Sequence, residues 1–182
     1  MIRARLITPP EPAITVDEAK QNMRVTEDAE DSLILGLIKA AGARAEKECG
    51  RAFGAQTWEV VLDAFPSGDI TVPVGPLVSV TSISYEPETG ATVIMDPTGY
   101  EIAAAHDEGL IVPLIDWPAV YGTRNAVVIR YVAGLGWPDD IKQAVHLLVG
   151  HWYNRRETAG ERMEEMPYGA CALMGLHRRM FA

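Results

Sequence analysis

The spacing of hydrophobic residues changes twice along the chain, and this limits the folds that the sequence can adopt. Between residues 15 and 50 the apolar residues recur every three or four positions, as on one face of an α-helix. From residue 56 to residue 133 short runs alternate between apolar and polar residues and are separated by Gly and Pro, which is typical of half-buried β-strands. Helical spacing returns over residues 139–157. The pattern predicts an α+β protein, a small helical bundle with an inserted antiparallel β-sandwich or barrel.

Four segments follow from this pattern. Residues 1–54 would hold a proline-rich arm and the N-terminal helices, and residues 55–136 the inserted β domain. Residues 137–157 would add the helix that completes the helical domain, and residues 158–182 a C-terminal docking tail. A chain of 182 residues is long enough for one domain, or for a small domain that carries a second one.

Two N-terminal helices have clear boundary signals. Thr15 and Glu18 form a capping box, and the helix that they start should end near Met23. A second helix should open in the acidic stretch 26–31 and stop at Gly50, which suits the left-handed position after a helix. Its small residues between 40 and 45 predict a surface for close packing. Its expected inner face comprises Leu33, Leu37, Ala40, Ala41 and Arg44, with Ile34 and Ile38 beside it.

The third helix follows Pro138, where Asp139 is suited to cap it. Its apolar residues should pack on the second helix. The expected core of the helical domain is Leu33, Leu37, Ala41, Ile141, Val145, Leu148 and Trp152. The charged end of this helix would present the contact candidates Tyr153, Arg155 and Arg156.

The β region and the tail carry weaker signals. In the run 78–86 the apolar phase slips between Val80 and Ile83, which predicts a β-bulge. Residues 158–166 are polar, and the apolar stretch after them is too short to form a core alone. We therefore expect residues 158–182 to dock onto another surface and to be poorly ordered or swung out in the isolated protein. The candidate docking residues are Leu173, Met174, Leu176, Arg178, Arg179 and Phe181.

Charge and composition exclude several classes of function. The net charge is −9, and residues 51–138 hold three Arg against ten Asp and Glu. So acidic a surface repels phosphate and disfavours tight binding of nucleic acid. There is no apolar run long enough to span a membrane, and the N-terminus lacks the apolar core of a secretion signal. Cys49 and Cys171 form no motif and are expected to be reduced thiols.

Motifs for catalysis are missing from the sequence. His146 and His151 stand five residues apart, about 140° around a helix, whereas zinc helices place two histidines four apart. No Gly-x-Ser-x-Gly elbow or phosphate-binding glycine loop is present. His106 and Asp107 are acid–base candidates without a nucleophile motif. We expect a protein that is not an enzyme and has no metal or cofactor.

Several short stretches in a fixed order resemble one family. They are Ile14–Lys20, Met23–Val25, Glu30–Ile34, Ile38–Ala41, Gln56–Val60, Gly75–Val80, Trp117–Pro118, Val132–Gly136, Ile141–Val145 and His151–Glu157. In order and spacing they resemble the head–tail connector (adaptor) proteins of tailed bacteriophages, in the longer form with a β insertion. The family also occurs in prophages and gene-transfer agents.

The resemblance implies a structural virion protein without cofactors, found in the virion neck and, during assembly, in the host cytoplasm. Such proteins form a ring, typically of twelve copies, under the portal, where they extend the DNA channel and seat the next component. The implied partners are the portal protein, neighbouring copies and the next neck or tail-completion protein. DNA would pass through without specific binding, and no membrane is involved.

Two other hypotheses stay open from the sequence. One is a β-domain module that binds a small ligand or a peptide in a concave apolar pocket within residues 56–133. The weaker one is a hydrolase that uses His106, Asp107 or His151.

Overall fold

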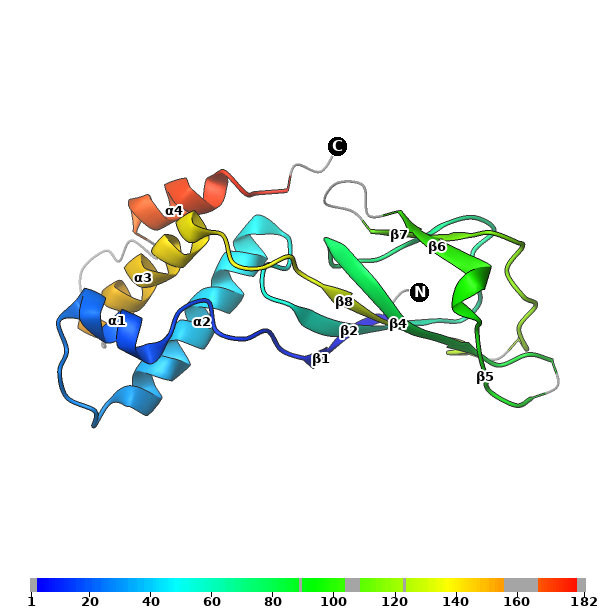
Figure 1. Cartoon of the computed structure of the whole chain (residues 1–182), viewed down its shortest axis with the longest axis horizontal. Helices are drawn as coiled ribbons and strands as arrows, with labels where there is room; N and C mark the ends of the chain where they lie inside the picture. The colour runs from blue at the N-terminus through cyan, green and yellow to red at the C-terminus, as the bar shows by residue number, and fades with distance from the viewer. Residues whose placement is uncertain (1–2, 89, 104–108, 123, 156–166, 180–182) are drawn as a thin grey trace. The chain divides into compact units, whose positions relative to one another are not determined.

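The computed structural model describes residues 3–88, 90–103, 109–122, 124–155 and 167–179 (Figure 1). It confirms the α+β class, with helices that pack together and strands in two antiparallel sheets. The chain forms two compact units. The β unit comprises Met1–Pro10 and Ala52–Leu135, and the helical unit comprises Glu11–Arg51 and Gly136–Ala182. The sequence had suggested that the first ten residues belong with the N-terminal helices. In the structure they belong to the β unit.

The β unit is built on a five-stranded antiparallel sheet with the strand order β1-β2-β8-β4-β5. Its strands are β1 (Arg3–Thr8), β2 (Gln56–Leu62), β8 (Val127–Ala133), β4 (Leu77–Tyr85) and β5 (Val93–Ile94). A second sheet has the order β3-β7-β6, with β3 (Ile70–Thr71), β7 (Leu110–Pro113) and β6 (Tyr100–Ala103), and η1 (Pro97–Gly99) precedes β6.

One hydrophobic core joins the two sheets. Val60 of β2 pairs with Ile129 of β8, and both side chains are buried in the same cluster as Ile70 of β3 and Ile111 of β7. Tyr131 is fully buried there as well, and burial raises the pKa of its hydroxyl to about 12. Two sheets around a shared core agree with the expected sandwich.

The five-stranded sheet contains the predicted bulge and one strand, β1, that was not predicted. The register of β4 against β8 shifts between Val80 and Ser82, which confirms the predicted bulge, and it shifts again between Leu77 and Ser79. Strand β1 was expected only as an arm. It pairs with β2 from Arg3 opposite Val61 to Thr8 opposite Thr57. As an edge strand it buries little apolar surface, so its sequence lacks the usual alternation.

The helical unit contains α1 (Val16–Met23), α2 (Asp31–Cys49), α3 (Asp139–Asn154) and α4 (Tyr168–Gly175), and α3 packs against the other three. The capping box of α1 is confirmed, with Glu18 N donating to Thr15 Oγ1 at 3.2 Å and Thr15 N to Glu18 Oε2 at 2.7 Å. These bonds from the Thr15 backbone and side chain lower the pKa of Glu18. Gly50 ends α2 at φ 68°, as predicted.

Two helix starts differ from the prediction. Helix α2 begins at Asp31 after the N-cap Glu30, at the last residue of the acidic stretch 26–31 that was expected to open it. Helix α3 has Pro138 as its N-cap, so Asp139 is already the first helical residue. Acidic residues are favourable throughout the first turn of a helix, so the sequence indicates the turn and not its first residue.

The inner face of α2 is rotated by about one residue from the expected one. Ile34, Ile38 and Ala41 are fully buried, whereas Leu33 is 42% exposed and Leu37 only half-buried. The pairs 33/34 and 37/38 are both apolar, so helical spacing alone fits either face. The small residues do serve close packing, because a Cβ on Gly42 would lie 3.2 Å from the Trp137 ring. On α3, Ile141, Val145 and Leu148 are fully buried and Trp152 is half-buried.

Candidate assembly surfaces of the helical unit

Helix α4 and the residues after it are folded onto the other helices of this unit. The side chains of Ala170 and Met174 are buried, Met174 with 3% exposure. Cys49 Sγ donates to the Met174 carbonyl at 3.4 Å, and Arg179 N donates to the Cys49 carbonyl at 2.8 Å. Burial raises the pKa of the Cys49 thiol to about 11, so it is an inert packing group.

Two side-chain contacts fix the segment that follows α4. His177 Nε2 lies 2.5 Å from Asp140 Oδ2, and this hydrogen bond lowers the pKa of the Asp140 carboxyl. Arg178 Nη2 lies 2.9 Å from Glu48 Oε2, and its Nε donates to the Glu48 carbonyl at 3.2 Å. Arg178 therefore also supplies positive charge at the C-terminal end of α2, where it is favoured.

The expected free tail is wrong for residues 167–179, because these residues pack on the unit. Residues 158–166, like Phe181, lie outside the described part of the chain. Among the docking candidates, Met174 is buried and Leu173 half-buried, while Leu176 is 77% exposed. The sequence did not reveal a partner for the apolar side of α4. The residues of α2 that cover it lie more than a hundred positions earlier in the sequence, and those of α3 about thirty positions earlier.

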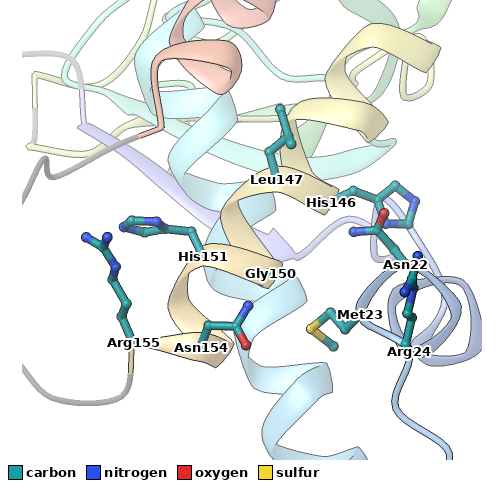
Figure 2. Close-up of a pocket in the computed structure, with 9 residues that line it drawn as sticks. All are labelled: Asn22, Met23, Arg24, His146, Leu147, Gly150, His151, Asn154 and Arg155. Atoms are coloured by element: carbon teal, nitrogen blue, oxygen red, sulfur yellow. The ribbon is translucent and has the colours of Figure 1, made fainter.

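A groove of about 440 Å³ lies between the C-terminal ends of α1 and α3 (Figure 2). Arg24 is the C-cap of α1 at φ 60°, and Arg155 is the C-cap of α3. A left-handed conformation is uncommon for an arginine and is normally taken by Gly. The nine lining residues are Asn22, Met23, Arg24, His146, Leu147, Gly150, His151, Asn154 and Arg155.

The groove is lined with hydrogen-bond donors. Neither Arg24 nor Arg155 forms an ion pair with another described residue. His146 Nδ1 is buried and finds no hydrogen-bond partner within the described residues, and burial lowers the pKa of this histidine. Figure 2 shows His146 directed toward Asn22 and His151 toward Arg155. The two histidines thus diverge, as their spacing predicted.

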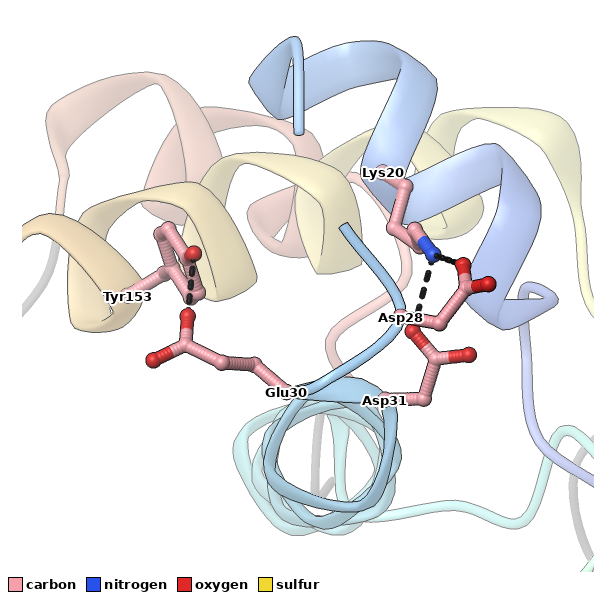
Figure 3. Close-up of polar contacts among 5 residues, drawn as sticks. All are labelled: Lys20, Asp28, Glu30, Asp31 and Tyr153. Atoms are coloured by element: carbon pink, nitrogen blue, oxygen red, sulfur yellow. Dashed lines mark hydrogen bonds and ion pairs between the residues drawn. The ribbon is translucent and has the colours of Figure 1, made fainter. Parts of the chain in front are cut away.

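Polar contacts at one end of the bundle connect three helices (Figure 3). Lys20 Nζ of α1 is 2.5 Å from Asp28 Oδ1 and 2.9 Å from Asp31 Oδ1. The bond to Asp28 raises the pKa of Lys20. Tyr153 of α3 donates to Glu30 Oε2 at 2.5 Å. Tyr153, one of the predicted contact candidates, thus forms a bond within the unit.

Of the remaining predicted site residues, the structure describes only some. Arg155 lines the groove, whereas Arg156, His106 and Asp107 lie outside the described residues. Asn22 and Arg24, which complete the groove, were not singled out from sequence. The one available signal was a cation at the end of a predicted helix.

Within the described residues no group of His, Cys, Asp or Glu is arranged to hold a metal ion. Nor is any described helix long and apolar enough to cross a membrane. The unit offers instead a donor-lined groove, an anchored C-terminal segment and exposed apolar side chains. Such features are typical of surfaces that contact other chains.

The comparison with known families makes this class specific. The chain belongs to the head completion protein family, whose model matches residues 13–180. Head completion proteins are structural and not enzymatic, so the hydrolase hypothesis is discarded. A search of the curated proteins found no match.

The fold is similar to chains of gene transfer agent particles along nearly its whole length. One is a chain of the neck of an empty particle computed with C6 symmetry, at a TM-score of 0.81 and 25% identity over 99% of this chain and 97% of that one. Another, from the virion of a native particle, has a TM-score of 0.78 and 25% identity over 98% and 96%. A chain of a native neck computed with C12 symmetry has a TM-score of 0.77 and 24% identity over 98% and 97%.

Proposed function

We propose that this chain is a neck protein of a gene-transfer-agent-like or phage-like particle. In that position it forms a ring under the portal, extends the DNA channel and seats the next neck or tail component. The proposal is carried by one observation, the likeness to a neck chain that extends over 99% of this chain and includes both units. The ring, the portal contact and the copy number of about twelve come from the family resemblance.

A test of the proposal is the location of the chain in purified particles. Cells that produce the particle with a tagged chain should yield particles whose neck carries the tag, as seen by cryo-electron microscopy. Cells that lack the chain should accumulate heads that are not joined to tails. Tag density in the capsid shell or the tail tube, or normal particles without the chain, would contradict the proposal.

The portal contact is assigned to the C-terminal end, residues 176–182. Leu176 is exposed, and Arg178 is held at the surface by Glu48, with its side chain 64% exposed. Removing residues 177–182 deletes the charged contacts and spares Ala170 and Met174, which belong to the packed helix. A truncation at residue 158 would remove those two buried side chains as well and is therefore a poor test.

We expect the chain without residues 177–182 to keep its helical content and to lose binding to the portal, measured by native mass spectrometry of the mixture. Arg178→Gln is a milder variant that removes one cation of the proposed portal contact together with its ion pair to Glu48. Undiminished portal binding by the truncated chain would show that the portal is recognised elsewhere.

The channel function fits the charge of the β unit. Its residues 1–10 and 52–135 hold four Arg against ten Asp and Glu, a net charge of −6. An acidic wall repels the phosphates of DNA, so the duplex slides past without being held. Retention of the purified chain on DNA at low salt would contradict this part of the proposal.

A further inference from the structure

The two units carry charges of opposite sign that have no ion-pair partner among the described residues. In the helical unit the groove is edged by two guanidinium groups, those of Arg24 and Arg155, without an ion-pair partner among the described residues. In the β unit four exposed carboxylates make neither an ion pair nor a hydrogen bond with a described residue. These are Asp69, Glu88, Glu101 and Asp116.

Two of these carboxylates lie at one place. Trp117 Nε1 donates to the Gly68 carbonyl at 2.8 Å, which brings the chain neighbours Asp69 and Asp116 to the same end of the β unit. The Trp117 ring also stacks on Phe65, with centroids 4.8 Å apart and planes 2° from parallel. The segment that carries Asp116 is therefore fixed by two independent contacts.

Exposed apolar side chains stand directly beside these carboxylates. Leu114 and Ile115 precede Asp116, and Ile115 is 76% exposed. We call the set Asp69, Leu114, Ile115 and Asp116 the acidic end. Two neighbouring aliphatic side chains in water are costly to leave uncovered, and aliphatic groups beside charges are typical of a contact surface.

The groove has the matching composition. Met23 and Leu147 offer apolar surface, and the guanidinium groups of Arg24 and Arg155 are able to bind carboxylates. The buried Nδ1 of His146 adds a polar atom that has no partner in the described residues. Cations at helix C-termini also balance the helix dipole, but that role does not require a groove or a buried nitrogen left unpaired.

We infer that the groove of one copy receives the acidic end of a neighbouring copy. This inference rests on the proposed function, in which copies form a ring. In a ring of more than two copies, each interface joins one surface of a copy to a different surface of its neighbour. Every copy therefore presents both surfaces. A basic groove and an acidic end on one chain are such a pair. Their charges would also set which surface meets which.

The first test is a charge swap, read as the amount of chain per capsid protein in purified particles. Arg24→Glu with Arg155→Glu should lower incorporation by at least about tenfold, and so should Asp69→Arg with Asp116→Arg. The chain with all four changes regains the attraction with reversed sign. It should recover to within about threefold of the original chain.

Matched controls carry the same charge changes elsewhere. Lys39→Glu with Lys47→Glu alters two exposed cations of α2, and Glu88→Arg with Glu101→Arg alters the other two carboxylates that lack a partner among the described residues. Both should incorporate normally. Equal losses in these controls would show a general effect of charge and overturn the inference, as would two harmful reversals whose combination fails to recover. Circular dichroism spectra confirm that each variant is folded.

The second test identifies the occupant directly. A photo-crosslinking amino acid replaces Asn154, and particles are assembled from a mixture of isotope-labelled and unlabelled copies. The inference predicts crosslinks from the groove to peptides of residues 66–72 or 110–120 that join labelled to unlabelled chains. Crosslinks within one chain, or to the portal, would overturn it.

The outcomes separate this inference from the proposed function. If the original chain is absent from necks, the proposed function fails. If necks contain the chain and all variants equally, the proposed function stands and the groove contact is refuted.

Discussion

The two units are held together by different means. In the β unit the backbone does most of the joining, because β2 pairs with β8 from Gln56 to Leu62 and β4 pairs with the other side of β8. In the helical unit the backbone bonds of the helices are mostly internal, with Arg179 N to the Cys49 carbonyl as an exception, so segments distant in sequence are joined mainly by side chains. The joining pairs are Lys20 with Asp28 and Asp31, Tyr153 with Glu30, His177 with Asp140, and Arg178 with Glu48.

The difference has a consequence for assembly. Polar contacts at helix ends are worth little each and are exchangeable, whereas a strand ladder opens only with its core. The ends of a helical unit joined in this way should therefore open at a lower cost in free energy than the strands of the β unit. The β unit is better suited to hold a fixed surface, such as the acidic end.

The largest expected effects come from the two cores. Leu148→Ala in α3 and Ile129→Ala in β8 each remove a fully buried side chain and should lower the free energy of unfolding by about 2–5 kcal/mol. Hydrogen exchange resolved by residue should place each loss in the unit that carries the change. Leu33→Ala is the control, because Leu33 is exposed, and it should cost less than about 1 kcal/mol. A large loss at Leu33 would show that the inner face of α2 is still misassigned.

A smaller effect is expected from one of the helix-end contacts. Tyr153→Phe removes the hydroxyl that donates to Glu30 and should cost about 1–2 kcal/mol, measured by urea unfolding. Tyr168→Phe is matched in chemistry, because Tyr168 is exposed and its hydroxyl makes no hydrogen bond with a described residue, and it should be neutral. If Tyr153→Phe is neutral too, side-chain contacts at the helix ends do not join the helical unit and the comparison breaks.

Local signals in the sequence were sufficient to predict the features that depend on neighbouring residues alone. The capping box of Thr15 and Glu18, the stop at Gly50 and the bulge between Val80 and Ser82 all depend on neighbouring residues. Each was predicted correctly. The α+β class was predictable for the same reason, because hydrophobic spacing is a property of each segment.

Features that depend on distant residues were not predictable. Strand β1 exists because β2 offers a free edge, and α4 is packed because Cys49 and its neighbours cover Met174. The groove combines residues 22–24 with residues 146–155. No local pattern marks such a pairing, and an arginine at the end of a helix has an ordinary explanation in the helix dipole.

Mild acid should weaken the helical unit selectively. Burial lowers the pKa of His146 in the folded chain, and the Glu18 charge only partly opposes this. The unfolded chain therefore takes up this proton more readily, at a pKa of about 6.5. Stability is fully present above that pH and is lost as the pH falls toward the lower folded pKa.

The measurement is the thermal unfolding midpoint, followed by the helical circular dichroism signal between pH 7.5 and pH 5. His146→Gln, which cannot be protonated, should lose less stability over this range than the original chain. His151 and His177 remain in both proteins, so the difference between the two isolates His146. Identical pH dependence would show that the burial of His146 does not penalise its charge.

The smallest effect compares two residues in the left-handed region, one in each unit. Arg24 has φ 60° and Asn125 has φ 63°, but asparagine tolerates this conformation and arginine does not. Arg24→Gly should raise the free energy of unfolding by about 0.5 kcal/mol, because relief of strain slightly exceeds the added entropy of the unfolded chain. Asn125→Gly should gain nothing. Urea unfolding of both variants measures the difference.

The sign of that change bears on why an arginine occupies the end of α1. If glycine at position 24 is the more stable choice, the arginine costs the fold something, and strain of this kind is expected where a side chain has a task outside the fold. The same variant should then incorporate poorly into necks, although it is better folded. A variant that is both less stable and normally incorporated would mean that Arg24 serves α1 alone, and the groove would lose one of its two guanidinium groups as a binding residue.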